Sequence, residues 1–178
     1  TMPLENLLPL TDKTLSCGLL NDVEQWTLLD PVYKAYTKDL CGYAERGEKE
    51  WKRLLGSFFA EGVNIAVVKN DEGQIEGYAV YRLGAPEIPV TEFVYTTRRA
   101  QRGLLNYFYN HRSQGESIRW NEGLHDTGYR FVPDGKTGHT TMPYMMARIV
   151  DVETALTTVP VNPEAVMMPI TLNIKVTD

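Results

Sequence analysis

Apolar residues in the first sixty positions follow the spacing of helices, after a short apolar run at 15–20 that predicts an opening strand. Asp22 and Asp30 mark possible helix starts, because an aspartate side chain accepts hydrogen bonds from the free N–H groups of a first turn. Pro31 fits directly after Asp30, since the first helical position forms no N–H hydrogen bond. The clearest helix follows, and its apolar positions are Trp51, Leu54, Leu55, Phe58 and Phe59. Such a stripe predicts a helix that packs against a core.

After Gly62 the apolar spacing changes from that of a helix to that of extended strands. Residues 65–68 and 75–83 are apolar runs on either side of Asn70-Asp71-Glu72-Gly73, a turn-forming sequence that predicts a β-hairpin. The elements predicted next are a strand at 90–95, a helix from about Arg98, a strand at 117–120 and a long loop at 121–141. This order predicts an α/β fold with a mixed sheet covered by helices.

The last part of the chain has a different pattern. Residues 142–152 are almost continuously apolar, which predicts that this segment starts as a buried strand. Residues 170–177 alternate between apolar and polar, which predicts a half-buried strand. A half-buried strand needs neighbours to pair with, because an exposed strand edge invites aggregation. We therefore expect two domains, at 1–141 and 142–178, and expect the second to be truncated.

Composition and charge narrow the class of protein. Hydrophobic residues make up 43% and charged residues 23% of the chain, as in ordinary globular proteins. No apolar run approaches the roughly 20 residues that a membrane span needs, so no membrane contact is expected. The net charge of −5 argues against nucleic-acid binding and is compatible with a cationic small-molecule substrate. Cys17 and Cys41 are too few for a disulfide scaffold, which favours free thiols and a cytoplasmic location.

Three histidines offer little evidence of acid–base or metal chemistry. His111, His125 and His139 have no metal-site spacing. His125-Asp126 could form an acid–base pair, but neighbouring residues on a strand point to opposite faces, and no nucleophile accompanies them. A surface histidine is the simpler interpretation of His125, and a partly buried one with a hydrogen-bond partner is the simpler interpretation of His111.

Three stretches together resemble one enzyme family. They read EGYAVYRL at 76–83, VTEFVYTTRRAQRGLLNYFYNHR at 90–112, and TTMPYMMARIVDVETAL at 140–156, the last following IRWNEGLHD at 118–126. The first two resemble the paired strands and the strand-to-helix element of the GNAT acetyltransferases. The third resembles the junction of the Eis-like (enhanced intracellular survival) acetyltransferases, where a second GNAT-like region passes into a sterol-carrier-like domain. The resemblance implies a mostly antiparallel sheet with helices on both faces.

The resemblance also draws attention to the loop that binds acetyl-CoA in GNAT enzymes. There, a Gln/Arg-x-x-Gly-x-Gly/Ala loop opens a helix, and its backbone N–H groups bind the cofactor's pyrophosphate. Aligned on Gly103, this chain has Ala100 in place of Gln or Arg, and Leu105 in place of a small residue. We therefore expect a degenerate loop, formed by Arg98, Arg99, Arg102 and Gly103, that does not bind acetyl-CoA. The arginines could still attract an anion, or they could belong to a solvated helix start or a domain interface.

Without a usable acetyl-CoA loop, the resemblance implies that this chain is one part of a larger acetyltransferase. The parent enzyme would transfer an acetyl group from acetyl-CoA to an amine-bearing small molecule. Its first GNAT region would bind the cofactor, and the far end of the sterol-carrier-like domain would supply the proposed base. This chain would then contain no catalytic residue and would contact those regions within the same polypeptide. We also expect the parent enzyme to be a homo-oligomer.

Four residues are candidates for lining the substrate cavity, namely Trp120, Tyr144, Met145 and Asp151. The alternative is that they are structural: Trp120 as part of a core, Tyr144 and Met145 in a buried strand, and Asp151 as the cap of a short helix from Val152 to Leu156. Two other functions stay open. One is a non-enzymatic binding or assembly module with a GNAT-like fold, and the other is a free-standing acetyltransferase that binds the cofactor unconventionally at Arg98 to Gly103.

Overall fold

A computed structural model gives the structure of the protein and describes residues 1–40, 42–123, 138–142 and 149–158. The chain divides into two units, Thr1–Thr140 and Thr141–Asp178. In chain order the strands are β1 (Met2–Pro3), β2 (Ser16–Leu20), β3 (Asn64–Lys69), β4 (Ile75–Tyr81), β5 (Glu87–Tyr95) and β6 (Ser117–Trp120). The helices are η1 (Leu4–Leu10) and η2 (Val23–Gln25), both 3₁₀, and α1 (Trp26–Thr37), α2 (Glu48–Ala60), α3 (Arg98–Tyr109) and α4 (Val152–Thr158).

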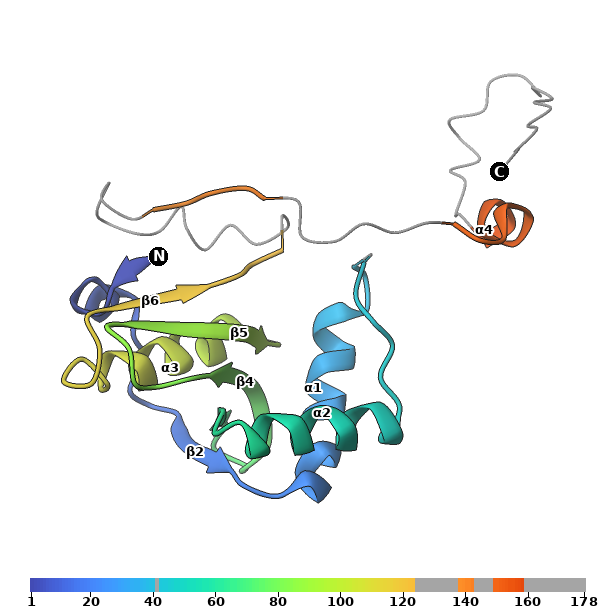
Figure 1. Cartoon of the computed structure of the whole chain (residues 1–178). Coiled ribbons are helices and arrows are strands. Elements are labelled where there is room, and N and C mark those ends of the chain that lie inside the picture. Colours follow the sequence, from blue (N-terminus) through green and yellow to red (C-terminus); the bar gives the residue numbers. More distant parts are fainter. Residues whose placement is uncertain (41, 124–137, 143–148, 159–178) are drawn as a thin grey trace. The chain divides into compact units, whose positions relative to one another are not determined.

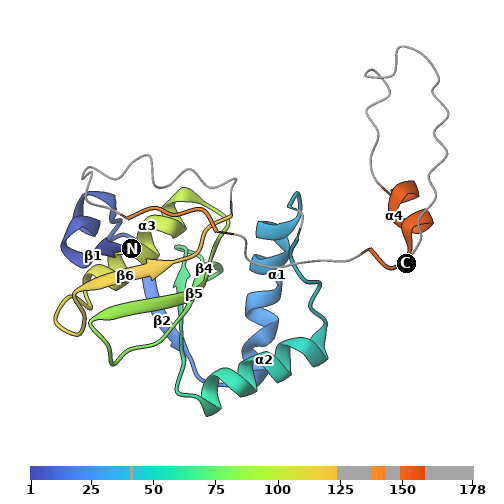
Figure 2. The same cartoon turned by 45° about the horizontal axis from the view of Figure 1, so that its top comes forward.

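The described residues of the first unit form a six-stranded sheet with the order β1-β6-β5-β4-β3-β2. Every neighbouring pair is antiparallel except β5 and β6, which are parallel and joined through α3. Helix α3 covers one face, and α1 and α2 cover the other (Figures 1 and 2). The predicted mixed, mostly antiparallel sheet with helices on both faces is thus confirmed, with the hairpin formed by β3 and β4.

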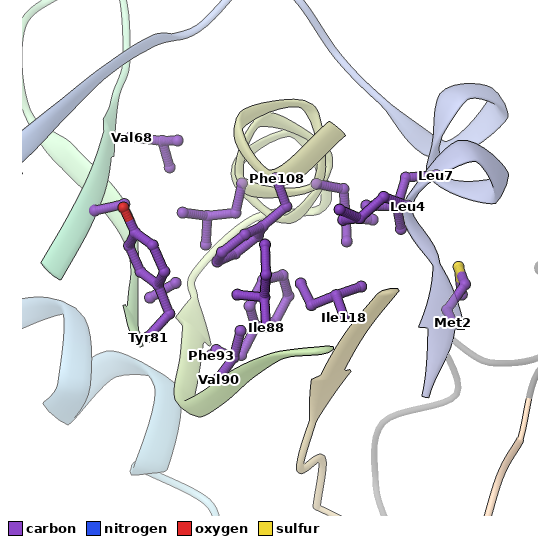
Figure 3. Packing of buried hydrophobic residues seen from close by; sticks show 14 of the residues in the cluster. Met2, Leu4, Leu7, Val68, Tyr81, Ile88, Val90, Phe93, Phe108 and Ile118 are labelled. Atoms are coloured by element: carbon purple, nitrogen blue, oxygen red, sulfur yellow. The ribbon is translucent and has the colours of Figure 1, made fainter. Parts of the chain in front are cut away.

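Alternation along the strands divides the core between the two faces. Ala66 and Val68 of β3 point into the cluster beneath α3, whereas Ile65 and Val67 point into the cluster beneath α1 and α2. Figure 3 shows the first cluster, in which Phe108 of α3 packs over β5 and β6 while η1 closes the side. Two residues of the predicted apolar stripe of α2, Trp51 and Leu55, are fully buried, with 1% of their surface exposed. The other three, Leu54, Phe58 and Phe59, are partly buried and pack against the same cluster.

The sequence predicts helix starts at Asp22 and at Asp30, but the structure has a start at Asp22 and none at Asp30. Asp22 caps the 3₁₀ turn η2, with its carboxylate accepting from the Glu24 N–H at 2.9 Å, and the chain continues directly into α1. The prediction that Asp30 begins a second helix is wrong, because Pro31 is the sixth residue of α1. Asp30 instead accepts a hydrogen bond from the Trp51 indole, so a tertiary contact uses the side chain that looked like a cap.

Strand β5 is longer than predicted and changes partners along its length. It pairs with β6 only from Glu87 to Val90, and a bulge at Thr91 shifts its register with β4 between Val80 and Tyr81. A bulge adds one residue to a strand and increases its local twist. Among the described residues, no strand pairs with β5 beyond Val90 on the β6 side. The parallel pairing therefore ends at Val90 and at Trp120, the last residue of β6.

The described part of the second unit contains only one regular element, α4. Residues 149–151 precede this helix without forming a strand. Residues 143–148 and 170–177, where the other strand predictions fall, lie outside the described residues, as does Cys41. Cys17 lies on β2 with a free thiol. The sterol-carrier-like assignment of this unit stays a prediction.

Candidate functional site

The connection between β5 and α3 is the place where the resemblance locates a cofactor loop. It consists of two residues, Thr96 and Thr97. The Thr96 N–H and hydroxyl both donate to the Glu76 carbonyl, at 2.9 and 3.1 Å. The Thr97 hydroxyl accepts from the Ala100 N–H at 3.0 Å and donates to the Glu76 carboxylate at 3.0 Å. Thr97 is thus the N-cap of α3, and a carboxylate lies beside it.

Each of the three arginines of this helix start is hydrogen-bonded within the chain. Arg98 donates to the side-chain oxygen of Gln101 at 2.7 Å. Arg99 binds both carboxylate oxygens of Asp71, at 3.1 and 3.4 Å, and its pKa is raised chiefly by this hydrogen bond. Arg102 donates to the Thr11 carbonyl at 3.3 Å. The predicted arginines thus lie at one helix end, where Arg99 links the helix to the β3–β4 turn and Arg102 links it to the residue after η1.

Gly103 does not lie at the helix start. It is the sixth residue of α3 and is buried against β2 and β3. A Cβ atom at this position would lie 3.2 Å from Leu15 Cδ1 and 3.3 Å from Val68 Cγ1. The glycine thus allows the helix to approach the sheet closely, and the alignment on Gly103 does not identify a phosphate loop. The sequence pattern misled because a glycine for packing and a glycine for phosphate contact look identical in one sequence.

These residues do not fit the pyrophosphate of acetyl-CoA. A phosphate at a helix N-terminus needs several backbone N–H groups free to point at it, and it is favoured by the positive end of the helix dipole. Here the Thr97 side chain takes the Ala100 N–H, and the Gln101 N–H donates to the Thr97 carbonyl. The Glu76 carboxylate adds a negative charge at the same corner. A two-residue connection also offers little backbone that could wrap around a phosphate.

A second polar cluster lies on the opposite face of the sheet, between α1, α2 and β5. The Arg46 guanidinium binds Glu92 through two hydrogen bonds, of 2.6 and 3.1 Å. The Tyr78 hydroxyl donates to the same carboxylate at 2.8 Å. Arg46 also lies 4.1 Å from the centre of the Tyr33 ring and 4.8 Å from that of Trp51. The carboxylate is thus bound on two sides, and the cation is bound by a carboxylate and two rings.

Burial and charge act against each other in this cluster. Burial lowers the pKa of Arg46, but the hydrogen bond and the negative charge of Glu92 outweigh it, so the pKa rises overall. Burial raises the pKa of Tyr78 well above its usual value, and the nearby Glu92 charge adds to the effect. Arg46 therefore stays protonated and Tyr78 neutral, as a donor, at any physiological pH. Paired charges of this kind are held firmly only where each is hydrogen-bonded.

A pocket of about 270 Å³ opens beside Arg46. Its lining comes from the end of α1 and from the residues before α2, and includes Tyr33, Thr37, Tyr43, Glu45 and Arg46. The Tyr33 hydroxyl donates to the Ala44 carbonyl at 2.8 Å and so fixes one wall. The sequence drew no attention to Arg46 or Glu92, since an exposed-looking arginine and a strand glutamate, 46 positions apart, form no motif. Only the packing of α1 and α2 on β5 joins them.

Trp120 is the last residue of β6 and pairs with Val90 of β5. Its ring centre is 5.8 Å from that of Phe93, and its indole N–H donates to the Glu122 carboxylate at 2.5 Å. Phe93 in turn contacts Tyr95, and Tyr95 contacts Tyr36 of α1, with ring centres 5.9 and 5.7 Å apart. Trp120 is partly buried against the cluster beneath α3. Its substrate-lining role stays a prediction beside this structural contact.

Of the candidates in the second unit, Tyr144 and Met145 lie outside the described residues. Asp151 caps α4: its carboxylate accepts from the Thr154 N–H at 3.0 Å and from the Thr154 hydroxyl at 2.7 Å. These hydrogen bonds lower the pKa of Asp151, the backbone one most. This is the contact that the structural alternative for Asp151 predicts. A role in holding an amine stays a prediction.

The described part of the chain contains no metal-binding cluster, and His111 contacts Tyr107. His111 Nδ1 lies 2.9 Å from the Tyr107 carbonyl oxygen, and its ring packs on that of Tyr107 with centres 4.5 Å apart. His125 lies outside the described residues. Within those residues, no three metal-binding side chains gather, and no helix is long and apolar enough to cross a membrane.

Comparisons with known proteins agree with the fold. Residues 42–149 match the family described as "Acetyltransferase (GNAT) domain". A search of curated protein sequences found no match. Among solved structures, a protein of unknown function from Enterococcus faecalis V583, described as a probable N-acyltransferase, is 21% identical with a TM-score of 0.58. The alignment covers 67% of this chain and 30% of that one, so the chain spans less than a third of that relative's length.

Two further solved structures are matched over nearly their whole length. A probable acetyltransferase is 14% identical with a TM-score of 0.52, over 75% of this chain and 99% of its own. An aminoglycoside acetyltransferase from an uncultured soil metagenomic sample is 15% identical with a TM-score of 0.51, over 77% and 99%. At these identities the likeness shows the fold alone. Because the family match covers more than half of the sequence, this chain belongs to the family of GNAT acetyltransferase domains.

Proposed function

We propose that this chain is a supporting region of an acetyl-CoA-dependent N-acetyltransferase that acts on an amine, and that it has no complete active site of its own. The parent would resemble the Eis-like enzymes, with a separate GNAT region that binds the cofactor and a sterol-carrier-like domain that completes the site. A cytoplasmic homo-oligomer is part of the same proposal. Family membership supports acetyl transfer in general.

The observation that carries the supporting role is the closed corner at the start of α3. Thr97 caps the helix, Glu76 lies beside the cap, and Arg99 is paired with Asp71. An incoming pyrophosphate would have to displace the side-chain cap and overcome the repulsion of Glu76. Neither cost arises in a loop whose free N–H groups face the ligand. The frame of the family is therefore present, whereas its phosphate site is occupied by the chain's own groups.

The test is a calorimetric titration of the chain with acetyl-CoA, with a single-domain GNAT acetyltransferase as the positive control. We expect no saturable heat up to about 1 mM, which corresponds to a binding free energy weaker than about −4 kcal/mol. A Kd in the micromolar range would overturn the proposal and favour a free-standing acetyltransferase. In that case Arg99→Ala would show whether this corner holds the cofactor.

A second measurement separates a supporting region from a non-enzymatic assembly module. The chain is mixed with the upstream region of its parent, and complex formation is checked by size-exclusion chromatography. Acetyl transfer to a diamine is then followed by release of CoA. We expect turnover in the mixture and none in the isolated chain. A verified complex that stays inactive, while the whole parent is active, would contradict the supporting role.

A further inference from the structure

The cluster around Arg46 has the composition of a cation-binding site. Its floor is the Glu92 carboxylate with the Tyr78 hydroxyl bound to it, and its walls are the rings of Tyr33 and Trp51. We call these four residues the cation cage. Carboxylates bind guanidinium groups through two parallel hydrogen bonds, and aromatic faces attract cations electrostatically. The cage combines both modes around a single group.

The walls of the cage have contacts in addition to those with the cation. The Trp51 indole donates to Asp30 at 2.9 Å, and the rings of Tyr33 and Trp51 meet edge to face with centres 5.6 Å apart. Tyr78 is fully buried in the middle of the sheet. Three of the four residues thus lie on α1, α2 and β4, whereas Arg46 lies outside these elements. Sites built on helices and strands are held more precisely than sites on loops.

The occupant, by contrast, comes from a segment without regular structure. Residues 42–47 form neither helix nor strand, and Gly42 has a positive φ of 87°. A pocket of about 270 Å³ is lined by Tyr33 and Arg46, among others, and does not include Glu92 in its lining. The side chains of Arg46 and Glu92 keep 16% and 17% of their surface exposed, so the pair is not sealed from solvent. A ligand would reach the carboxylate when Arg46 turns outward.

We propose that the cation cage is a binding site for small alkylguanidinium ligands, and that Arg46 is its built-in occupant, which such a ligand displaces. Guanidinium rather than ammonium is the favoured ligand, because only its planar fork forms two parallel hydrogen bonds with Glu92. The ligand competes with Arg46, so the affinity of the intact chain equals the intrinsic affinity multiplied by the fraction of molecules in which Arg46 is out of the cage. The inference goes beyond the proposed function and does not depend on acetyl transfer.

The test uses n-propylguanidinium, which is the arginine side chain without its backbone, and n-propylurea as the neutral control. The probe is titrated at constant ionic strength while the indole N–H resonance of Trp51 is followed by NMR, assigned with Trp51→Phe. We expect a saturable shift in the intact chain with a Kd in the millimolar range, and no shift with n-propylurea. Removal of the occupant in Arg46→Ala should tighten binding by about ten- to a hundredfold, because the competing contact is gone.

Matched variants decide the remaining outcomes. Arg46→Ala/Glu92→Gln should lose the tightened binding, because the carboxylate that binds the guanidinium is gone. Should Arg46→Ala fail to fold, the titration of the intact chain still decides the matter. Binding to Arg46→Ala but none to the intact chain at a hundred times that Kd would overturn the proposal and leave Arg46 with Glu92 as a structural ion pair. An intact chain that responds equally to n-propylurea would overturn it as well.

Discussion

Two arginine–carboxylate pairs on opposite faces of the sheet show how differently the same residue types act. Arg46 and Glu92 lie beneath α1 and α2 with 16% and 17% of their side chains exposed. Arg99 and Asp71 lie at the start of α3 with 40% and 77% exposed. Both arginines contact both oxygens of their partner. Only the first pair has lost most of its water.

The difference matters because water screens an exposed pair and competes for its hydrogen bonds. A buried charge that loses its partner has neither water nor protein to replace it. An exposed charge is rehydrated at once. The Arg46 pair should therefore be important for stability and able to select a cation of the same shape. The Arg99 pair should contribute little stability. Its main effect is that the Asp71 carboxylate offsets the positive charge that Arg99 adds at the start of α3.

The largest expected effect is on the buried pair. Glu92→Ala leaves Arg46 charged and unpaired between two rings, and should lower the free energy of unfolding by about 3 kcal/mol. Urea denaturation followed by circular dichroism measures this change. Tyr78→Phe is the matched control, since it removes one hydrogen bond to the same carboxylate but no charge, and should cost about 1–2 kcal/mol. A loss below that of Tyr78→Phe would contradict the contrast between buried and exposed pairs.

A smaller effect is expected at the N-cap of α3. Thr97→Ala removes the side-chain acceptor of the Ala100 N–H and should lower the free energy of unfolding by about 1 kcal/mol. Thr97→Ser keeps the hydroxyl, and its stability should stay close to that of the unchanged chain. The same urea experiment compares the two variants. If they prove equally unstable, the methyl group rather than the cap is responsible.

The smallest effect is expected for the exposed pair. Arg99→Ala should leave the urea midpoint nearly unchanged, because solvent replaces the lost contact with Asp71. Any residual difference should shrink further in 1 M NaCl, where charges are screened within about 3 Å. Arg99→Lys is the control for charge without the forked geometry. A destabilisation comparable to that of Glu92→Ala would show that this corner is as buried in solution as the other.

The sequence predicted the elements of the first unit well, because each carries a local signal. The stripe from Trp51 to Phe59 repeats with a helical period, and the Asn70–Gly73 turn separates two apolar runs. The predictions failed where a residue has more than one use. Asp30 looked like a helix cap and binds Trp51 instead, and Gly103 resembled a phosphate-loop glycine and serves the packing of α3 on β3. Local pattern does not distinguish these uses.

By itself, the sequence determined the order of helices and strands in the first unit, and it placed three arginines in the first turns of α3. Only the tertiary structure decided how that helix start is closed, because Glu76 and Asp71 reach it from the neighbouring hairpin. The same holds for the cation cage, whose members come from α1, α2, β4 and β5. Periodicity along a chain reports which side of an element is buried. Which polar groups meet inside depends on how the elements pack, and that is set by contacts distant in sequence.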